Sequence, residues 1–94
     1  MQSQIWHYVI SVEWYSNGSQ YSIERITRHG TLEVYSEQTS EDIFNWALED
    51  ANLAMRADHA KRWGLEDEPE VMSKIDFGEP FVVAWDLRPN IPLA

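Results

Sequence analysis

Histidine is the residue type in this chain best suited to acid–base or metal chemistry, and the chain has 3: His7, His29 and His59. None of them stands at the spacing of a metal motif such as His-Glu-x-x-His. The chain has no cysteine, which excludes disulfides, thiolate metal sites and cysteine nucleophiles. It also lacks a G-x-S-x-G motif and a phosphate-binding glycine loop. We therefore expect no catalytic, metal-binding or cofactor-binding residues, and His7 is the one alternative centre for catalysis or small-ligand binding.

The acidic residues are the second group with a chemical use, because 16 Asp and Glu oppose 7 Lys and Arg and give a formal charge of −9. Twelve of the acids and four of the bases lie in residues 37–80. Such a field repels nucleic-acid phosphates and anionic membranes, and it attracts a basic protein. These charges either engage a basic partner, or imitate nucleic-acid phosphates, or serve solubility alone. The expected acidic contact surface comprises Glu41, Asp42, Glu49, Asp50, Glu66, Asp67, Glu68 and Glu70.

Residues 4–15 alternate in the way that is typical of a strand with one buried face. The large apolar or aromatic side chains at the even positions predict the core face: Trp6, Tyr8, Ile10, Val12 and Trp14. Asn17-Gly18 follows, and this dipeptide predicts a two-residue hairpin.

Beyond that hairpin the alternation breaks, and a β-bulge at Glu24-Arg25 restores it and sets Ile26 opposite Ile10. Arg28-His29-Gly30 then predicts a second hairpin turn that ends on a left-handed glycine. Residues 1–36 are therefore expected to form a three-stranded antiparallel meander.

Residues 39–63 predict one long helix, since no proline or glycine interrupts them before Gly64. We expect Thr39 or Ser40 to cap its start with Asp42 completing a capping box, and Gly64 to end it. About 24 residues span roughly 36 Å, so one helix can cover one face of the meander. The expected packing stripe is Phe44, Ala47, Leu48, Ala51, Ala54 and Met55, with Ile43 beside it.

Residues 65–80 predict an acidic connection, residues 81–87 a fourth strand and residues 88–94 an irregular tail. In the fourth strand one face is expected to carry Phe81, Val83, Trp85 and Leu87. The fold class is therefore α+β, with the order βββαβ in a single domain of residues 1–94. The fourth strand can lie beside the first strand or the third. We expect the first, and hence a sheet order of 3-2-1-4, because the aromatic row then continues.

The sheet face turned away from the helix is the second candidate site. Its residues are Ile5, His7, Val9, Tyr15, Tyr35, Val82 and Ala84. One helix cannot cover both faces of a sheet, so this face predicts a contact surface, most simply that of a homodimer. The alternative is that residues 66–80 or the proline-rich tail cover it.

Three segments of the chain resemble small uncharacterised proteins of actinobacteria and their phages: Trp6-His7-Tyr8-Val9-Ile10, the Asn-Gly hairpin and residues 39–47. The resemblance covers about the first half of the chain and includes no diagnostic motif. It implies an accessory protein of a phage or mobile element, of the kind that binds a host or virion protein.

No apolar run approaches the ~18 residues that a membrane span needs, and residues 1–4 do not resemble a signal peptide. The absence of cysteine also favours a cytoplasmic location. The sequence as a whole predicts a small acidic, non-enzymatic protein-interaction or accessory protein that binds a protein partner or itself. The first alternative is an acidic inhibitor or nucleic-acid mimic that binds a basic host protein. The second is a ligand binder or enzyme that uses His7.

Overall fold

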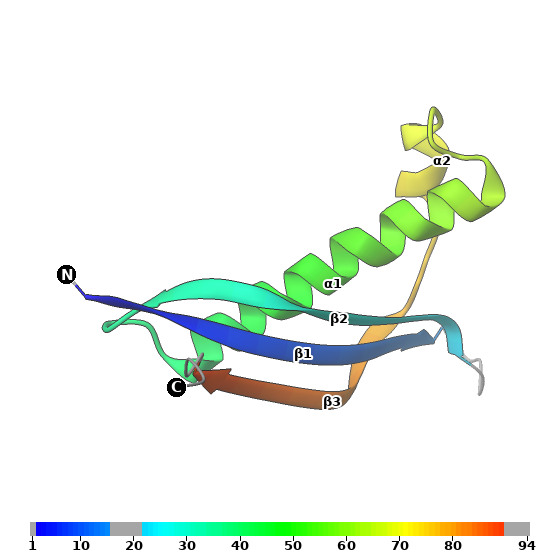
Figure 1. The fold of residues 1–94 in the computed structure, drawn as a ribbon. Coiled ribbons are helices and arrows are strands. Elements are labelled where there is room, and N and C mark those ends of the chain that lie inside the picture. Colours follow the sequence, from blue (N-terminus) through cyan, green and yellow to red (C-terminus); the bar gives the residue numbers. More distant parts are fainter. Residues whose placement is uncertain (1, 16–21, 90–94) are drawn as a thin grey trace.

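The computed structural model describes residues 2–15 and 22–89. Its elements follow in the order β1 (Ser3–Tyr15), β2 (Ser22–Tyr35), α1 (Ser40–Trp63), α2 (Pro69–Ser73) and β3 (Glu79–Pro89). The strands form one antiparallel sheet in the order β2-β1-β3, and α1 lies over one of its faces (Figure 1). The expected Asn17-Gly18 turn lies outside the described residues.

The expected four-stranded sheet with the order 3-2-1-4 is wrong. β2 runs without interruption through Arg28, His29 and Gly30, where a hairpin turn was expected, so the second and third predicted strands are one strand. Because the chain reverses once less before α1, β3 returns antiparallel to β1. The last strand does lie beside β1, as expected.

The register between β1 and β2 also differs from the expected one. Ile26 pairs with Val12 and not with Ile10, and the irregularity lies between Trp14 and Tyr15 and not at residues 24–25. The break in alternation beyond residue 23 therefore has another cause. The helix-facing positions of β2 include Glu24 and Arg28, whose charged groups are paired with side chains of α1.

Gly30 has a packing role in place of the expected turn. It pairs with Tyr8, and a Cβ atom at Gly30 would lie 3.3 Å from the Tyr8 ring and from its hydroxyl oxygen. The glycine leaves room for the ring to cross the strand, so that the Tyr8 hydroxyl reaches Asp50 of α1 at 3.3 Å. Gly30, which the sequence pattern places in a turn, is therefore a position within a strand where a neighbouring side chain approaches the backbone closely.

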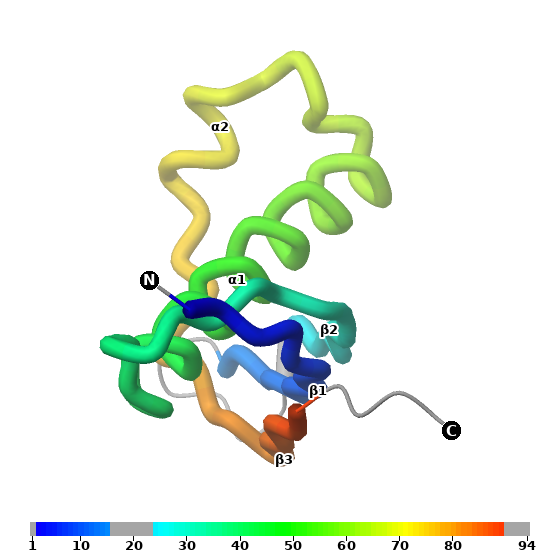
Figure 2. The backbone as a smooth tube through the Cα atoms, turned by 60° about the vertical axis from the view of Figure 1, so that its left-hand side comes forward, coloured from blue at the N-terminus to red at the C-terminus, as the bar shows by residue number. Residues whose placement is uncertain are grey.

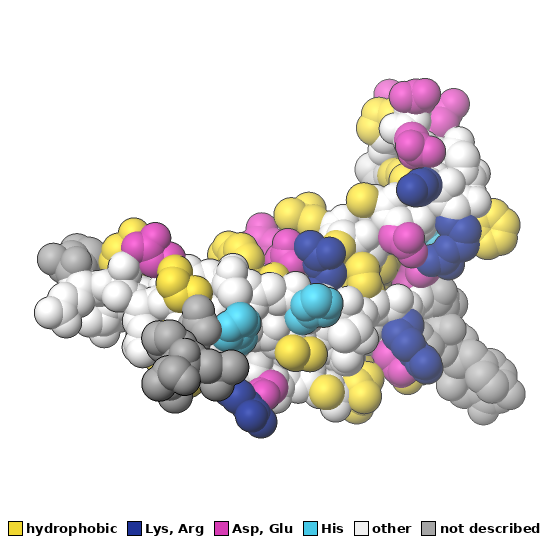
Figure 3. All heavy atoms as spheres, viewed as in Figure 1, with side chains coloured by type: hydrophobic (Ala, Val, Ile, Leu, Met, Phe, Trp, Pro, Cys, Tyr) yellow, Lys and Arg dark blue, Asp and Glu magenta, His cyan; other side chains and the backbone are white. Residues whose placement is uncertain are grey.

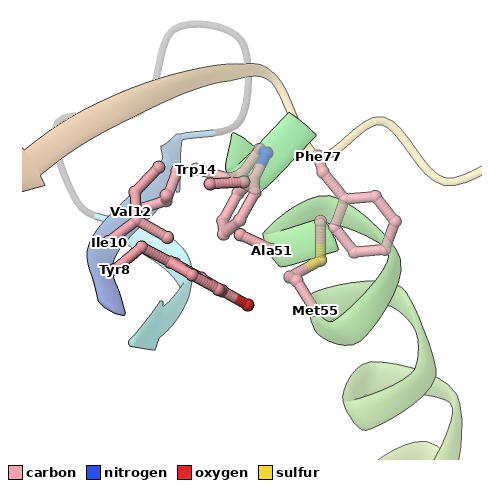
Figure 4. Packing of buried hydrophobic residues seen from close by; sticks show 8 residues of the cluster. Tyr8, Ile10, Val12, Trp14, Ala51, Met55 and Phe77 are labelled. Carbon is pink, nitrogen blue, oxygen red and sulfur yellow. The ribbon is translucent and has the colours of Figure 1, made fainter. Parts of the chain in front are cut away.

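The core lies between β1, the part of α1 that ends at Met55 and the segment that precedes β3 (Figure 4). The expected core face is confirmed at the four positions from Tyr8 to Trp14, whereas Trp6 is half-buried. On α1 the small side chains of Ala47 and Ala51 let the helix approach the sheet closely. The buried cluster comprises Tyr8, Ile10, Val12, Trp14, Ala47, Ala51, Met55 and Phe77.

Both ends of α1 are capped as the sequence predicts. The Thr39 hydroxyl accepts from the Asp42 amide at 3.2 Å, and the Asp42 carboxylate accepts from the Thr39 amide at 3.0 Å. Gly64 ends the helix in the left-handed conformation with φ 67°. The boundaries of this helix are therefore set by local chemistry that needs no partner element.

α1 departs from the sheet along its length, and α2 with residues 64–78 continues beyond its far end on the helix side (Figure 1). The Cα radius of gyration is 15.8 Å, where a compact domain of this length would have roughly 12 Å. Residues 66–78 thus do not cover the outer face of the sheet, contrary to one of the two expectations.

A second irregularity changes which residues of β3 face the core. The register with β1 shifts between Ser11 and Val12, so that Ala84 pairs with Ser11 but Val82 pairs with Val12. Val82 packs against the core, whereas Phe81 and Val83 are 59% and 54% exposed. The expected common face of β3 is therefore wrong for those two residues.

We expect Gly30→Val to lower the free energy of unfolding by about 1–3 kcal/mol, because the added methyl groups crowd the Tyr8 ring. His29→Val, at the neighbouring exposed position of β2, should change that free energy by less than about 0.5 kcal/mol. Urea unfolding followed by tryptophan fluorescence measures both values. Equal effects of the two substitutions would contradict the packing of Tyr8 over Gly30.

Candidate functional site

The outer face of the sheet, which is the face opposite α1, is uncovered across the described residues. Near one end it exposes Ile5, Val9 and Tyr35, each at 38–43%. Because β1 alternates regularly over this stretch, these side chains point away from the buried ones. Hydrophobic side chains and histidine are interspersed over the sheet on the side that Figure 3 presents. The structure therefore brings together on this face the predicted residues of β1 with Tyr35 and Ala84, and it moves Val82 to the core side.

His7 lies in the middle of this outer face and is exposed. Its cross-strand neighbours are Thr31 on β2 and Arg88 on β3. Neither of these two directly opposite residues is a carboxylate, and the next positions of β1 on this face, Ile5 and Val9, pair with Glu33 and Asp86. Among residues 2–15 and 22–89, no group of three or more His, Asp or Glu side chains could hold a metal ion. The geometry around His7 is that of an open surface.

The far end of the outer face carries a polar and aromatic group. The Tyr15 hydroxyl donates to the Glu13 carboxylate, and this hydrogen bond raises the pKa of Tyr15. Glu13 also pairs with Arg25 at 2.7 Å across the β1–β2 ladder. The Tyr15 ring meets Phe81 edge to face at 6.5 Å. Apolar area at this end is thus bordered by an ion pair, as at the rim of a protein interface.

The expected acidic contact surface is not one surface. Asp42 belongs to the capping box, and Asp50 pairs with Arg28 at 3.1 Å while accepting from the Tyr8 hydroxyl. Burial and the Asp50 carboxylate raise the pKa of Tyr8. Glu41 and Glu49 are exposed on α1. The others lie on the exposed tip that joins α1 to α2, roughly 36 Å from the start of the helix: Glu66, Asp67, Glu68 and Glu70.

A buried charged cluster was missed by the sequence reasoning. The Glu24 carboxylate is 5% exposed and lies 2.5 Å from His59 Nδ1, and Arg62 donates to both of its oxygens at 3.2–3.3 Å. Arg62 also pairs with Asp58 at 2.6 Å, and that hydrogen bond, foremost, raises its pKa. The His59 ring stands edge to face on Phe77 at 5.0 Å. The missed signal is a pair of charges at positions 24 and 28, which share one face of a strand.

A groove of about 380 Å³ runs along α1 on the side of the chain that leads into β3. Its apolar lining comes from Trp14, Leu48, Phe77 and Pro80, and its polar wall from Asn45, Glu49, Asn52 and Arg56. It is open to solvent on one side, and its lining residues include none of the three histidines.

No protein-family model, curated protein or solved structure matches this chain. The resemblance to small actinobacterial and phage proteins therefore stays an expectation. Among the described helices, even α1 is too polar to cross a membrane.

Glu24→Gln should lower the free energy of unfolding by about 1–3 kcal/mol, because it replaces a buried charge-assisted network by a neutral amide whose NH2 group faces other donors. Glu33→Gln is the matched control on the same strand, where the exposed carboxylate accepts only from Ser3 at 2.6 Å among the contacts described here. It should cost less than about 0.5 kcal/mol. Chemical denaturation of both variants measures the free energy of unfolding. A Glu24→Gln protein with the same free energy of unfolding as the wild type would show that the cluster adds no stability.

Proposed function

We propose that this protein is a non-enzymatic interaction protein that binds another protein through the outer face of its sheet. The observation that carries the proposal is the exposure of Ile5, Val9 and Tyr35 on a sheet face that no described element covers. Apolar side chains gathered on one exposed face are typical of a protein–protein contact site.

The chemistry of the face indicates the kind of partner. The outward-facing residues of β1 alternate along the chain with the buried ones. They form one row in which the apolar Ile5 and Val9 are interspersed with the polar His7 and Ser11. Ser11 and Thr27 share a hydrogen bond of 2.8 Å on the same face. A flat, mixed surface of this type suits a protein with a similar flat apolar patch.

We expect Val9→Lys to weaken partner binding by about tenfold or more, since it places a charge in the middle of the apolar row. Leu53→Lys is the matched control, because Leu53 is an exposed apolar residue of α1, on the opposite side of the molecule. Tagged proteins purified from the source cells, with mass spectrometry of the bound proteins, measure retention of the partner. A partner retained by Val9→Lys but lost from Leu53→Lys would contradict the proposal.

A second candidate function, an acidic inhibitor or nucleic-acid mimic, is favoured by the projecting tip. Glu66, Asp67, Glu68 and Glu70 are all exposed there within five residues. A basic partner bound to this tip should dissociate steeply as salt rises, because exposed charges are screened beyond about 10 Å at 0.1 M.

The tip is tested by replacing its four acids together with Gln or Asn. Under this alternative the substitution abolishes the salt-sensitive part of partner binding, measured by titration at two salt concentrations. Binding that is insensitive to salt and to the substitution excludes it, and the Val9→Lys result then decides the sheet face.

A further inference from the structure

The free edge of β3 is the strongest feature that the proposed function leaves unused. Among residues 2–15 and 22–89, β3 pairs with a strand, β1, on one side only, so that no described strand pairs with its other side. Residues 81–88 between Pro80 and Pro89 contain no proline and keep every backbone N–H donor. Proteins usually protect such an edge with charges, proline or a covering element. Here the centre of the strand carries exposed Phe81 and Val83.

The inner row of β3 is also incompletely covered. Val82, Trp85 and Leu87 face the core side but remain half-exposed. α1 packs mainly over β1 and β2, and Figure 2 shows β3 at the border of the sheet away from it. Trp85 meets α1 through an edge-to-face contact with Phe44 at 5.2 Å. A strand added beside β3 would cover the open flank of this apolar row.

The irregularity in β3 decides which register a second copy of β3 can adopt. Consider two copies of one regular strand that pair antiparallel. Residues of the two copies that lie opposite each other point to the same face only if their residue numbers have an even sum. The extra residue at Val83 changes this parity halfway along β3. Two β3 strands related by a two-fold axis therefore have core-side residues opposite core-side residues along their whole length only if the numbers of opposing residues have an odd sum. In that arrangement the extra residues of the two strands lie close together.

One such register also matches the charges. With Val83 opposite the partner's Ala84, Val82 lies opposite the partner's Trp85 on the core side. In the same register Glu79 lies opposite the partner's Arg88 on the outer side, and the two-fold axis makes this contact twice. Arg88 pairs with Asp86 of its own chain at 2.7 Å, so Glu79 joins an existing ion pair. The register shifted by two residues towards the start of β3 would instead place Glu79 opposite the partner's Asp86, which is repulsive.

We propose that two copies of this chain join edge to edge through β3, as a two-fold antiparallel pair that sets Glu79 opposite the partner's Arg88. The two sheets become one, and both α1 helices lie on the same face of it. The edge of β2 is unsuited to this role, because its core-side row contains Glu24 and Arg28, which are held by α1. The proposal goes beyond the proposed function, since it leaves the outer face free for another protein and doubles its area.

The oligomeric state is the first test. Light scattering should give twice the chain mass of 11.0 kDa. Ala84→Cys should then form a disulfide-linked dimer under mild oxidation, because the two copies of residue 84 lie roughly 6 Å apart near the two-fold axis. Thr31→Cys, on the same face but on β2, is the matched control and should stay unlinked. The chain has no other cysteine, so each link is unambiguous.

Charge reversal is the second test. Glu79→Arg alone, or Arg88→Glu alone, places like charges opposite each other twice per dimer and should raise the dimer dissociation constant about tenfold. The double variant Glu79→Arg/Arg88→Glu restores the attraction and should return the constant to within about threefold of wild type. Circular dichroism of each variant shows that it is folded.

Each outcome decides between the two proposals. A monomer at high concentration overturns the edge-to-edge dimer and leaves the outer-face proposal standing. If the dimer dissociation constant is unchanged by both charge reversals but Val9→Lys abolishes the dimer, the copies associate through the outer face. That result also overturns the edge-to-edge dimer. A dimer with the Ala84 link and charge rescue, together with loss of the partner in Val9→Lys, supports both.

Discussion

The pairing of two charged residues of β2 with α1 is the constraint on which the rest of the structure depends. The buried apolar cluster holds α1 only as far as Met55, and the helix departs from the sheet along its length. Arg28 meets Asp50 in the middle of the helix, and Glu24 meets His59 and Arg62 near its end. Burying the Glu24 carboxylate costs free energy unless its hydrogen bonds are made, so the fold must keep the end of α1 over β2 to keep it satisfied.

These same residues explain why part of the fold could not be predicted from the sequence. A charged residue where alternation expects an apolar one indicates either a bulge or turn that changes the phase, or an unbroken strand whose polar group finds a partner. Local patterns cannot separate these cases, because the partners of Glu24 lie 35 and 38 residues further along the chain. By contrast the capping box at Thr39 and the left-handed Gly64 are local, and the bounds of α1 follow from them. The regular alternation of β1 likewise predicts its buried face.

The candidate site could be predicted where it depends on that alternation and not where it depends on register. Ile5, Val9 and Tyr35 emerge on the outer face because β1 and the end of β2 are regular. Val82 lies on the core side because β3 gains one residue at Val83, which no turn residue signals in the sequence. The acids were misjudged for a different reason, since neighbours in sequence separate along a straight helix and two of them serve the fold itself.

Holding α1 over β1 and β2 has a cost at the opposite border of the sheet, because one helix cannot also cover β3. The residues there are more apolar than a free edge tolerates, and Trp85 and Leu87 are only half-buried. The irregularity at Val83 would protect an edge by bending it away from a regular strand. It does not exclude a second strand that carries the same irregularity at the same place. The proposed self-association therefore rests on two constraints taken together: charges that draw the helix towards β2, and a strand shape that a second copy of β3 can match.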